Sequence, residues 1–218
     1  MAPELIIVGV GHVFDISQKI EKIIMEEEPD AVAVELDGAR AKVLIEGKGK
    51  GKSPNIFYSM LSKIQERISK KFGGKTGREM LAAIHTSWDK GIPVYYIDMD
   101  ANIIISKLWK SISLRKKFHL LFSSILSLFL SKERIEKEVK NFEKSPDDFM
   151  EEMEREFPQF KKILIDERNE YMARKLEEIL SLNNKVVVVV GEGHVKGIKD
   201  FLGDKEIKIR EIHLSELL

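Results

Sequence analysis

Two histidines follow glycine-rich turns at the ends of apolar runs. His12 ends the segment Leu-Ile-Ile-Val-Gly-Val-Gly-His, and His194 follows the valine run Lys185–Val190 through Gly-Glu-Gly. A β-branched run without alternation that ends in glycine predicts a parallel strand buried on both faces. Core packing has no use for an imidazole at the carboxyl end of such a strand, whereas a ligand-binding site does. A single histidine there is more often a loop or capping residue, but the repeated context favours a functional role.

Two acidic residues stand at the ends of other predicted strands, Glu35 in the second and Asp98 after the third. In open parallel α/β sheets, ligands bind at this carboxyl edge. Two imidazoles with one or two carboxylates suit a divalent ion such as manganese, cobalt or zinc. Such an ion activates a bound water and polarises a carbonyl, which is the chemistry of metal-assisted hydrolysis. The predicted metal ligands are His12, His194, Glu35 and Asp98. The structural alternatives are that Glu35 marks where its strand meets water and that Asp98 caps the next helix.

The elements that must position these residues alternate between strands and helices along the chain. The predicted strands are Leu5–Val10, Ala31–Leu36, Val94–Ile97, Lys185–Val190 and Ile207–Ile212. A strand–helix–strand order implies right-handed parallel crossovers. We therefore predict an α/β fold with a mainly parallel central sheet flanked by helices. Residues 1–100 form the first part of its core, 101–182 an all-helical insertion and 183–218 the closing part of one compact domain.

Helix signals complete this prediction. Asp15 or Ser17 is expected to cap a helix that runs to about Glu27, and a second, short helix covers Asp37–Glu46. Thr76-Gly-Arg-Glu matches a capping box, in which threonine and glutamate satisfy each other's backbone amides. That helix runs to Lys90, and its predicted inward residues are Met80, Ala83, Ile84, Ser87 and Trp88.

Arg168 interrupts the apolar stripe of the last long predicted helix, about Gln159–Leu182. The helical period places Glu167 and Arg168 where the next apolar pair belongs. Burying a charge is costly unless it is paired or reaches a polar pocket. The sequence therefore predicts that Arg168 either enters a site or forms a structural ion pair with Glu167 or Glu35.

Composition narrows the function classes. The 218 residues are 43% hydrophobic, enough for a real core, and 36 basic side chains balance 36 acidic ones, which argues against a nucleic-acid partner. The chain has no cysteine, so disulfides, thiolate metal sites and a cysteine nucleophile are excluded.

The apolar segment Phe118–Leu130 is shorter than the ~20 apolar residues of a spanning helix. It predicts a buried or groove-lining helix and a homodimer interface in a cytoplasmic protein, with peripheral membrane contact as the alternative.

Nucleotide sites and a serine hydrolase are weaker interpretations. The run from Gly9 imitates a dinucleotide fingerprint, but Phe14 occupies the place of the third glycine and His12 crowds the pyrophosphate position. Gly51-Lys-Ser imitates the end of a P-loop, but Glu46 stands where the earlier glycine is required. There is no Gly-x-Ser-x-Gly elbow for a serine hydrolase.

Short motifs in a fixed order resemble the TraB/PrgY pheromone-shutdown family, which is related to the TIKI metalloproteases and to erythromycin-esterase-like and ChaN-like proteins. The matching segments, which extend over nearly the whole chain, are Gly9–His12, Val34–Arg40, Gly77–Glu79, Asp98–Asp100, Glu167–Met172, Gly191–His194 and Gly197-Ile198. Two positions depart from the family pattern, Val10 and Met99. Many archaeal relatives continue into membrane helices, so we expect this chain to be a soluble member or a soluble portion.

The resemblance implies an α/β fold and a metal-dependent hydrolase, with His12, Glu35 and His194 as its metal or catalytic core. Glu79, Asp98 and Arg168 are the implied supporting residues. We predict Glu35 or Glu79 as general base, Arg168 as the group that stabilises the oxyanion, and Arg40 and Tyr171 as substrate contacts.

Three functions remain open from the sequence. The first is a metal-dependent hydrolase that acts on a peptide or a small amide or ester. The second is a non-catalytic protein that sequesters a peptide or hydrophobic ligand in a cleft roofed by the helical insertion. The third is a membrane-peripheral regulatory module that uses Lys107–Lys117 and the apolar helix after it.

Overall fold

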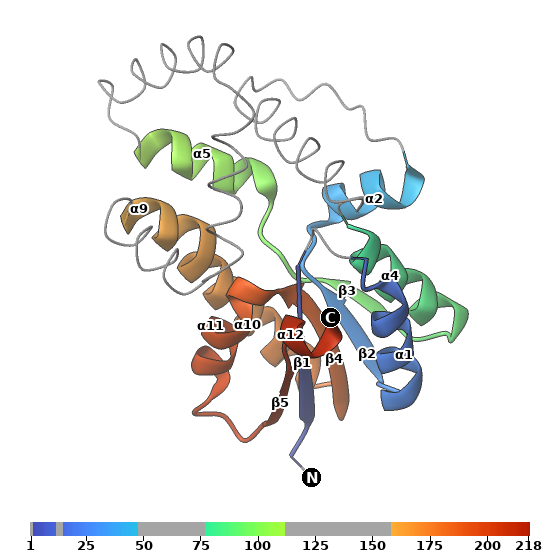
Figure 1. Ribbon diagram of the computed structural model, residues 1–218. Helices are drawn as coiled ribbons and strands as arrows, with labels where there is room; N and C mark the ends of the chain where they lie inside the picture. Colours follow the sequence, from blue (N-terminus) through green and yellow to red (C-terminus); the bar gives the residue numbers. More distant parts are fainter. Residues whose placement is uncertain (1, 12–14, 48–76, 112–157) are drawn as a thin grey trace. The chain divides into compact units, whose positions relative to one another are not determined.

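The computed structural model describes residues 2–11, 15–47, 77–111 and 158–218. Its sheet has five strands in the order β3-β2-β4-β1-β5, and every pairing is parallel (Figure 1). The strands are β1 Glu4–Val10, β2 Ala31–Val34, β3 Val94–Tyr96, β4 Lys185–Gly191 and β5 Lys208–Ile212. The predicted α/β fold with a parallel central sheet is confirmed.

Helices connect and cover the strands. They are α1 Ser17–Glu27, α2 Gly38–Glu46, α4 Arg78–Asp89, α5 Ala101–Ser111, α9 Pro158–Lys161, the π-helical turn η1 Lys162–Asp166, α10 Glu167–Leu180, α11 Glu192–Leu202 and α12 Leu214–Leu217. The chain divides into two compact units, residues 1–101 with 168–218, and residues 102–167. Nearly all of α10 therefore belongs with the sheet. Among the helices of the described ranges, none combines the length and apolar composition that crossing a bilayer requires.

Each face of the sheet has its own apolar core. On one face, α10 and α11 pack against alternate strand residues such as Leu5 and Val188. On the other face, α1 and α4 pack against the intervening residues, such as Ile6 and Val189 (Figure 1). The five valines of β4 are completely buried, and full burial of one valine stabilises a fold by about 1.5–3 kcal/mol. This explains why β4 lacks the alternation of a half-exposed strand.

Two details of the predicted helices are wrong. The N-cap of α1 is Ile16 without a side-chain capping bond, because Ser17 Oγ donates to Asp15 Oδ1 instead. The helix α4 starts from Gly77 with a left-handed φ of 88° and no side-chain capping bond, and Thr76, the threonine of the predicted capping box, lies outside the described residues. Trp88 is 49% exposed and stacks on His85, because it lies in the last turn of α4 at the margin of the buried stripe.

Candidate functional site

The two glycine-rich turns leave neighbouring strands toward opposite faces of the sheet. Val10 at the end of β1 pairs with Gly191 at the end of β4. After β1 the chain enters α1 on one face, whereas after β4 it enters α11 on the other. This is the topological switch point, where ligands of open α/β sheets bind. His194 lies in the first turn of α11 at this point, and His12 lies outside the described residues.

Arg168 joins the two predicted strand-end carboxylates. Its Nε donates to Asp98 Oδ1 at 2.9 Å and its Nη2 to Asp98 Oδ2 at 2.8 Å, a bidentate pair. The same Nη2 contacts Glu35 Oε1. All three side chains are almost completely buried. Arg168 therefore forms the buried ion pair with Glu35, which is one of the outcomes predicted from its position in the apolar stripe.

Arg40 extends this network to the start of α2. Asp37 is the N-cap of α2 and accepts from the Arg40 backbone N–H at 2.9 Å and from Arg40 Nε at 2.5 Å. Arg40 Nη2 contacts Asp98 Oδ2, so both oxygens of Asp98, a predicted metal ligand, are bonded to guanidinium groups. Burial opposes ionisation of Asp37, but its bonds to Arg40 and to the Ala101 amide outweigh this and lower the pKa of the carboxyl.

His194 contacts Glu35 Oε1, the same carboxylate oxygen that Arg168 contacts. Its Nε2 lies 3.3 Å from Glu35 Oε1, and its Nδ1 lies 2.6 Å from Asn169 Oδ1. The Gly191 amide donates to Glu35 Oε2 at 2.6 Å. Burial would raise the pKa of Glu35, but the His194 ring, the Arg168 guanidinium and the Gly191 amide hold that pKa far below its usual range. Glu35 is therefore an ionised carboxylate at neutral pH.

Part of this arrangement fits a metal ion. The 3.3 Å between His194 Nε2 and Glu35 Oε1 matches two tetrahedral ligands, each about 2.1 Å from one ion. Metal-binding histidines usually form a hydrogen bond to an oxygen through their other ring nitrogen, as His194 Nδ1 does with Asn169 Oδ1. Arg168 also occupies Glu35 Oε1, however, and residues 2–11, 15–47, 77–111 and 158–218 contain no group of three suitable His, Asp or Glu side chains. A complete site therefore requires a ligand such as His12.

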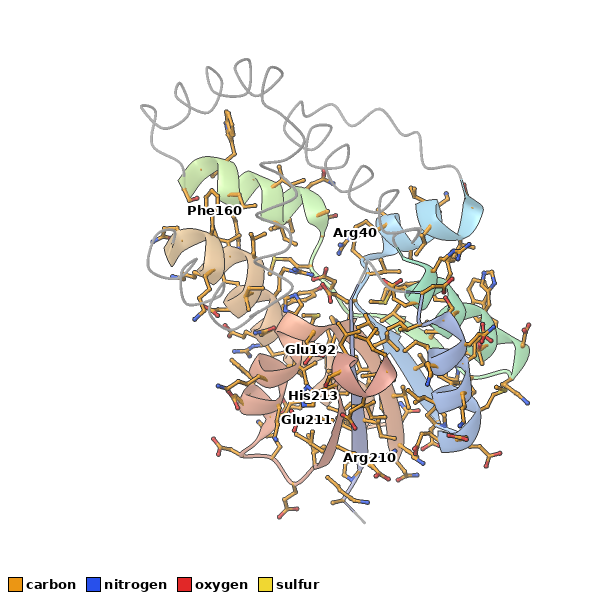
Figure 2. The ribbon with its side chains drawn as sticks, in the orientation of Figure 1. Arg40, Phe160, Glu192, Arg210, Glu211 and His213 are labelled. Carbon is orange, nitrogen blue, oxygen red and sulfur yellow. The ribbon has the colours of Figure 1, made fainter. Side chains whose placement is uncertain are left out.

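A second histidine–carboxylate pair, which no sequence motif predicted, lies beside the switch point. Glu192 Oε1 lies 2.7 Å from His213 Nδ1, and Glu192 Oε2 accepts from the Leu214 amide at 2.9 Å. Figure 2 labels the two partners, which come from the start of α11 and the residue after β5. The only local sign was the glutamate inside Gly-Glu-Gly-His.

Glu79 and Tyr171 are the other predicted site residues that the structure describes. Glu79 is buried in the first turn of α4. Tyr171 is partly exposed on α10. Their roles as general base and substrate contact stay predictions, as does that of Arg40.

We predict that Gly9→Ala destabilises the protein by about 1–3 kcal/mol, the usual cost of overpacking. A Cβ on Gly9 would overlap the Glu192 carboxylate and lie 2.9 Å from Val195 Cγ2. The control is Gly38→Ala, because a Cβ at Gly38 meets no atom within 4 Å. Urea unfolding of both variants tests this prediction, and equal effects of the two substitutions would contradict it.

We predict that the Glu192–His213 pair makes stability depend on pH. The hydrogen bond to Glu192, helped by the nearby charges of Glu211 and Glu216, raises the pKa of His213. A raised pKa means that this stabilisation is complete below about pH 6.5 and is lost as the pH rises through the folded-state value. The urea midpoint of the wild type should therefore fall more steeply above about pH 6.5 than that of Glu192→Gln. Parallel pH curves for the two proteins would contradict this; His213 is 44% exposed, so the expected effect is small.

The fold and the site together define an α/β protein with a buried acid–histidine–arginine network at the carboxyl edge of its parallel sheet. The chain belongs to the TraB/PrgY/gumN family, whose sequence model matches residues 2–210. It is 32% identical to Uncharacterized protein MJ1365 of Methanocaldococcus jannaschii, in an alignment that covers 99% of this chain and 57% of that protein. The chain thus spans little more than half the length of this relative. The family predicted from the sequence motifs is confirmed.

Proposed function

We propose that this protein is a metal-dependent hydrolase that cleaves an amide or ester bond in a peptide or small molecule. The observation that carries the proposal is the pair formed by His194 Nε2 and the ionised Glu35, 3.3 Å apart at the switch point. The relationship to the TIKI metalloproteases, inferred from the sequence motifs, also supports it. The cost of burying so many charges supports a site rather than a purely structural cluster.

The residues proposed to hold the ion are His194 and His12, with Glu35 beside them. A bound manganese, cobalt or zinc ion supplies Lewis acidity toward a carbonyl and a water molecule. His12 follows the end of β1 by two residues in the sequence, and the last residue of that strand, Val10, pairs with Gly191. Asp98 acts instead through Arg168, because both its oxygens accept from arginines.

The proton chemistry is divided among the carboxylates. A carboxylate whose pKa lies far below neutral is a weak general base, so Glu35 is better suited to fixing charge and orientation. This leaves Glu79 as the proposed general base. The guanidinium of Arg168, whose pKa is raised by Glu35 and Asp98 against the effect of burial, stays charged and supplies the positive potential for an oxyanion.

The test combines metal content with turnover. The chelator-treated chain is reloaded with manganese, cobalt or zinc, its metal content is measured, and it is assayed on quenched fluorescent peptides and nitrophenyl esters. We expect the His12→Ala and His194→Ala variants to bind no metal and to have an activity at least about 100-fold lower than that of the wild type. His85→Ala, which alters an exposed histidine on α4, is the control.

Two outcomes would overturn the proposal. Folded His12→Ala and His194→Ala variants that keep full metal and activity would exclude the proposed ligands. Saturable ligand binding that survives chelators, without turnover, would instead support a sequestering protein. The proposed dimer interface and peripheral membrane contact depend on Phe118–Leu130, which lies outside the described residues.

A further inference from the structure

The Asp98 carboxylate uses its whole acceptor capacity on neighbouring groups of the protein. A carboxylate offers about four lone-pair sites. Oδ1 accepts from Arg168 Nε at 2.9 Å and from the Met99 backbone N–H at 2.7 Å. Oδ2 accepts from Arg168 Nη2 at 2.8 Å and from Arg40 Nη2. The Asp98 side chain is completely buried, so water cannot readily replace a lost donor. Asp98 is therefore an anchor for the two arginines.

Arg40 is itself fixed at the start of α2. Its Nε donates to Asp37 Oδ2 at 2.5 Å, and its backbone N–H donates to Asp37 Oδ1 at 2.9 Å. Asp37 Oδ2 also accepts from the Ala101 amide at 3.3 Å, at the start of α5. Asp37 thus holds the guanidinium of Arg40, which Figure 2 labels, while Nη2 of the same group reaches Asp98. A continuous series of bonds therefore runs from Asp37 through Arg40 and Asp98 to Arg168.

The charges explain why Asp98 has two guanidinium partners. Arg168 lies against two buried carboxylates, those of Asp98 and Glu35. Each of them reduces the positive potential that Arg168 can offer to a developing oxyanion. Because Arg40 shares the charge of Asp98, Arg168 keeps more of its own potential. Burial makes this effect larger than it would be in water, where charges are screened.

We infer that Arg40 is a positioning residue: through Asp98 it fixes the Arg168 guanidinium, and it does not itself contact the substrate. This inference deepens the proposed function, since its catalytic meaning rests on the role proposed there for Arg168. The fixing of Arg168 can be measured whether or not the protein is a hydrolase.

The first test measures how firmly Arg168 is held, without substrate or metal. Nitrogen NMR of arginine-labelled protein follows solvent exchange of the Arg168 Nε hydrogen, whose signal is assigned from its loss in Arg168→Lys. In the wild type this hydrogen should exchange at least about 10-fold more slowly than that of Arg174, which is 67% exposed. Arg40→Met should accelerate the Arg168 exchange by about 10-fold or more. The control is Lys42→Met, which alters a 75% exposed residue of α2 and should leave the exchange unchanged.

A local effect must be distinguished from a loss of overall stability. Exchange of the backbone amide of Val188, which is completely buried in β4, reports opening of the whole sheet. Arg40→Met should accelerate exchange at Arg168 more than at Val188.

Two further variants test the route through Asp98. In the Asp98→Ala background, adding Arg40→Met should change the Arg168 exchange no further, because the side chain that joins the two arginines is gone. Arg40→Lys keeps the charge but lacks the planar fork that reaches Asp37 and Asp98 together, so its Arg168 exchange rate should be intermediate.

Kinetics distinguish a positioning residue from a substrate contact. If the protein is a hydrolase, Arg40→Met should lower kcat by about 10–100-fold, as small displacements of a group at the reacting centre do. KM should change by less than about twofold, because Arg40 does not hold the substrate. The metal content should stay the same, because Arg40 acts through Asp98, which is not a proposed ligand.

Several results would overturn the inference. One is a folded Arg40→Met variant whose Arg168 exchange is unchanged, or is accelerated only as much as that of Val188. Another is a raised KM with unchanged kcat, which would make Arg40 a substrate contact. Wild-type exchange at Arg168 as fast as at Arg174 would also contradict it.

If Arg40→Met does not fold, Arg40→Lys decides the question by the same measurement. Absence of hydrolysis together with the expected exchange pattern would refute the proposed function and leave the fixing of Arg168 by Arg40 standing.

Discussion

Replacing Arg168 with methionine is expected to destabilise the protein by about 3–5 kcal/mol, the cost of breaking a buried ion pair by removing one partner. The Arg168 side chain is 12% exposed and binds Asp98 through two nitrogens and Glu35 through one of them. Its loss leaves two buried carboxylates facing each other without their shared cation. Arg168→Lys should recover only part of the loss, because a single ammonium group cannot reproduce the bidentate fork.

The control lies on the same helix. Arg174 is 67% exposed and pairs with Glu170 at 2.8 Å, four residues earlier. Arg174→Met should therefore change stability by less than about 0.5 kcal/mol. Urea unfolding at neutral pH measures both variants. A loss of less than about 1 kcal/mol for Arg168→Met would mean that the network is far more hydrated than its burial indicates.

The sheet could be predicted from the sequence because its signals are local. Continuous β-branched runs ending in glycine located β1 and β4, and polar residues at strand ends identified Glu35 and His194 as neighbours. Parallel strands bring their carboxyl ends to one edge, so this part of the site follows from topology alone. The interruption of the apolar stripe likewise located Arg168.

The remaining contacts depend on how helices cross, and no local pattern encodes that. Asn169 meets His194 only because Gly197 lets α10 approach α11, and the three residues come from two helices. A glycine within a helix, three residues after a candidate histidine, was the available signal for such an approach. The start of α4 is a related case. The helix begins at a left-handed Gly77, where a Cβ would lie 3.0 Å from Leu44 Cδ1, and sequence spacing carries no information about that packing.

Replacing Glu35 with glutamine is expected to remove stability that is present at neutral pH and absent in acid. The pKa of Glu35 is lower in the folded protein than in the unfolded chain. Its contribution is therefore complete above the unfolded-state pKa of about 4.3 and is lost as the pH falls toward the folded-state value. Other carboxyls with lowered pKa, including Asp37, also destabilise the protein in acid, so the wild-type curve alone cannot isolate Glu35.

The difference between the two proteins does isolate Glu35. At pH 7 the variant should be less stable by about 3 kcal/mol or more, since Arg168 loses a buried charged partner. Below about pH 4.3 this difference should shrink steadily, because the wild-type unfolded chain takes up a proton that the folded protein resists. Glu170→Gln, on the exposed face of α10, should give curves parallel to the wild type. A difference between Glu35→Gln and wild type that stays constant down to about pH 3 would show that Glu35 is not held ionised by His194 and Arg168.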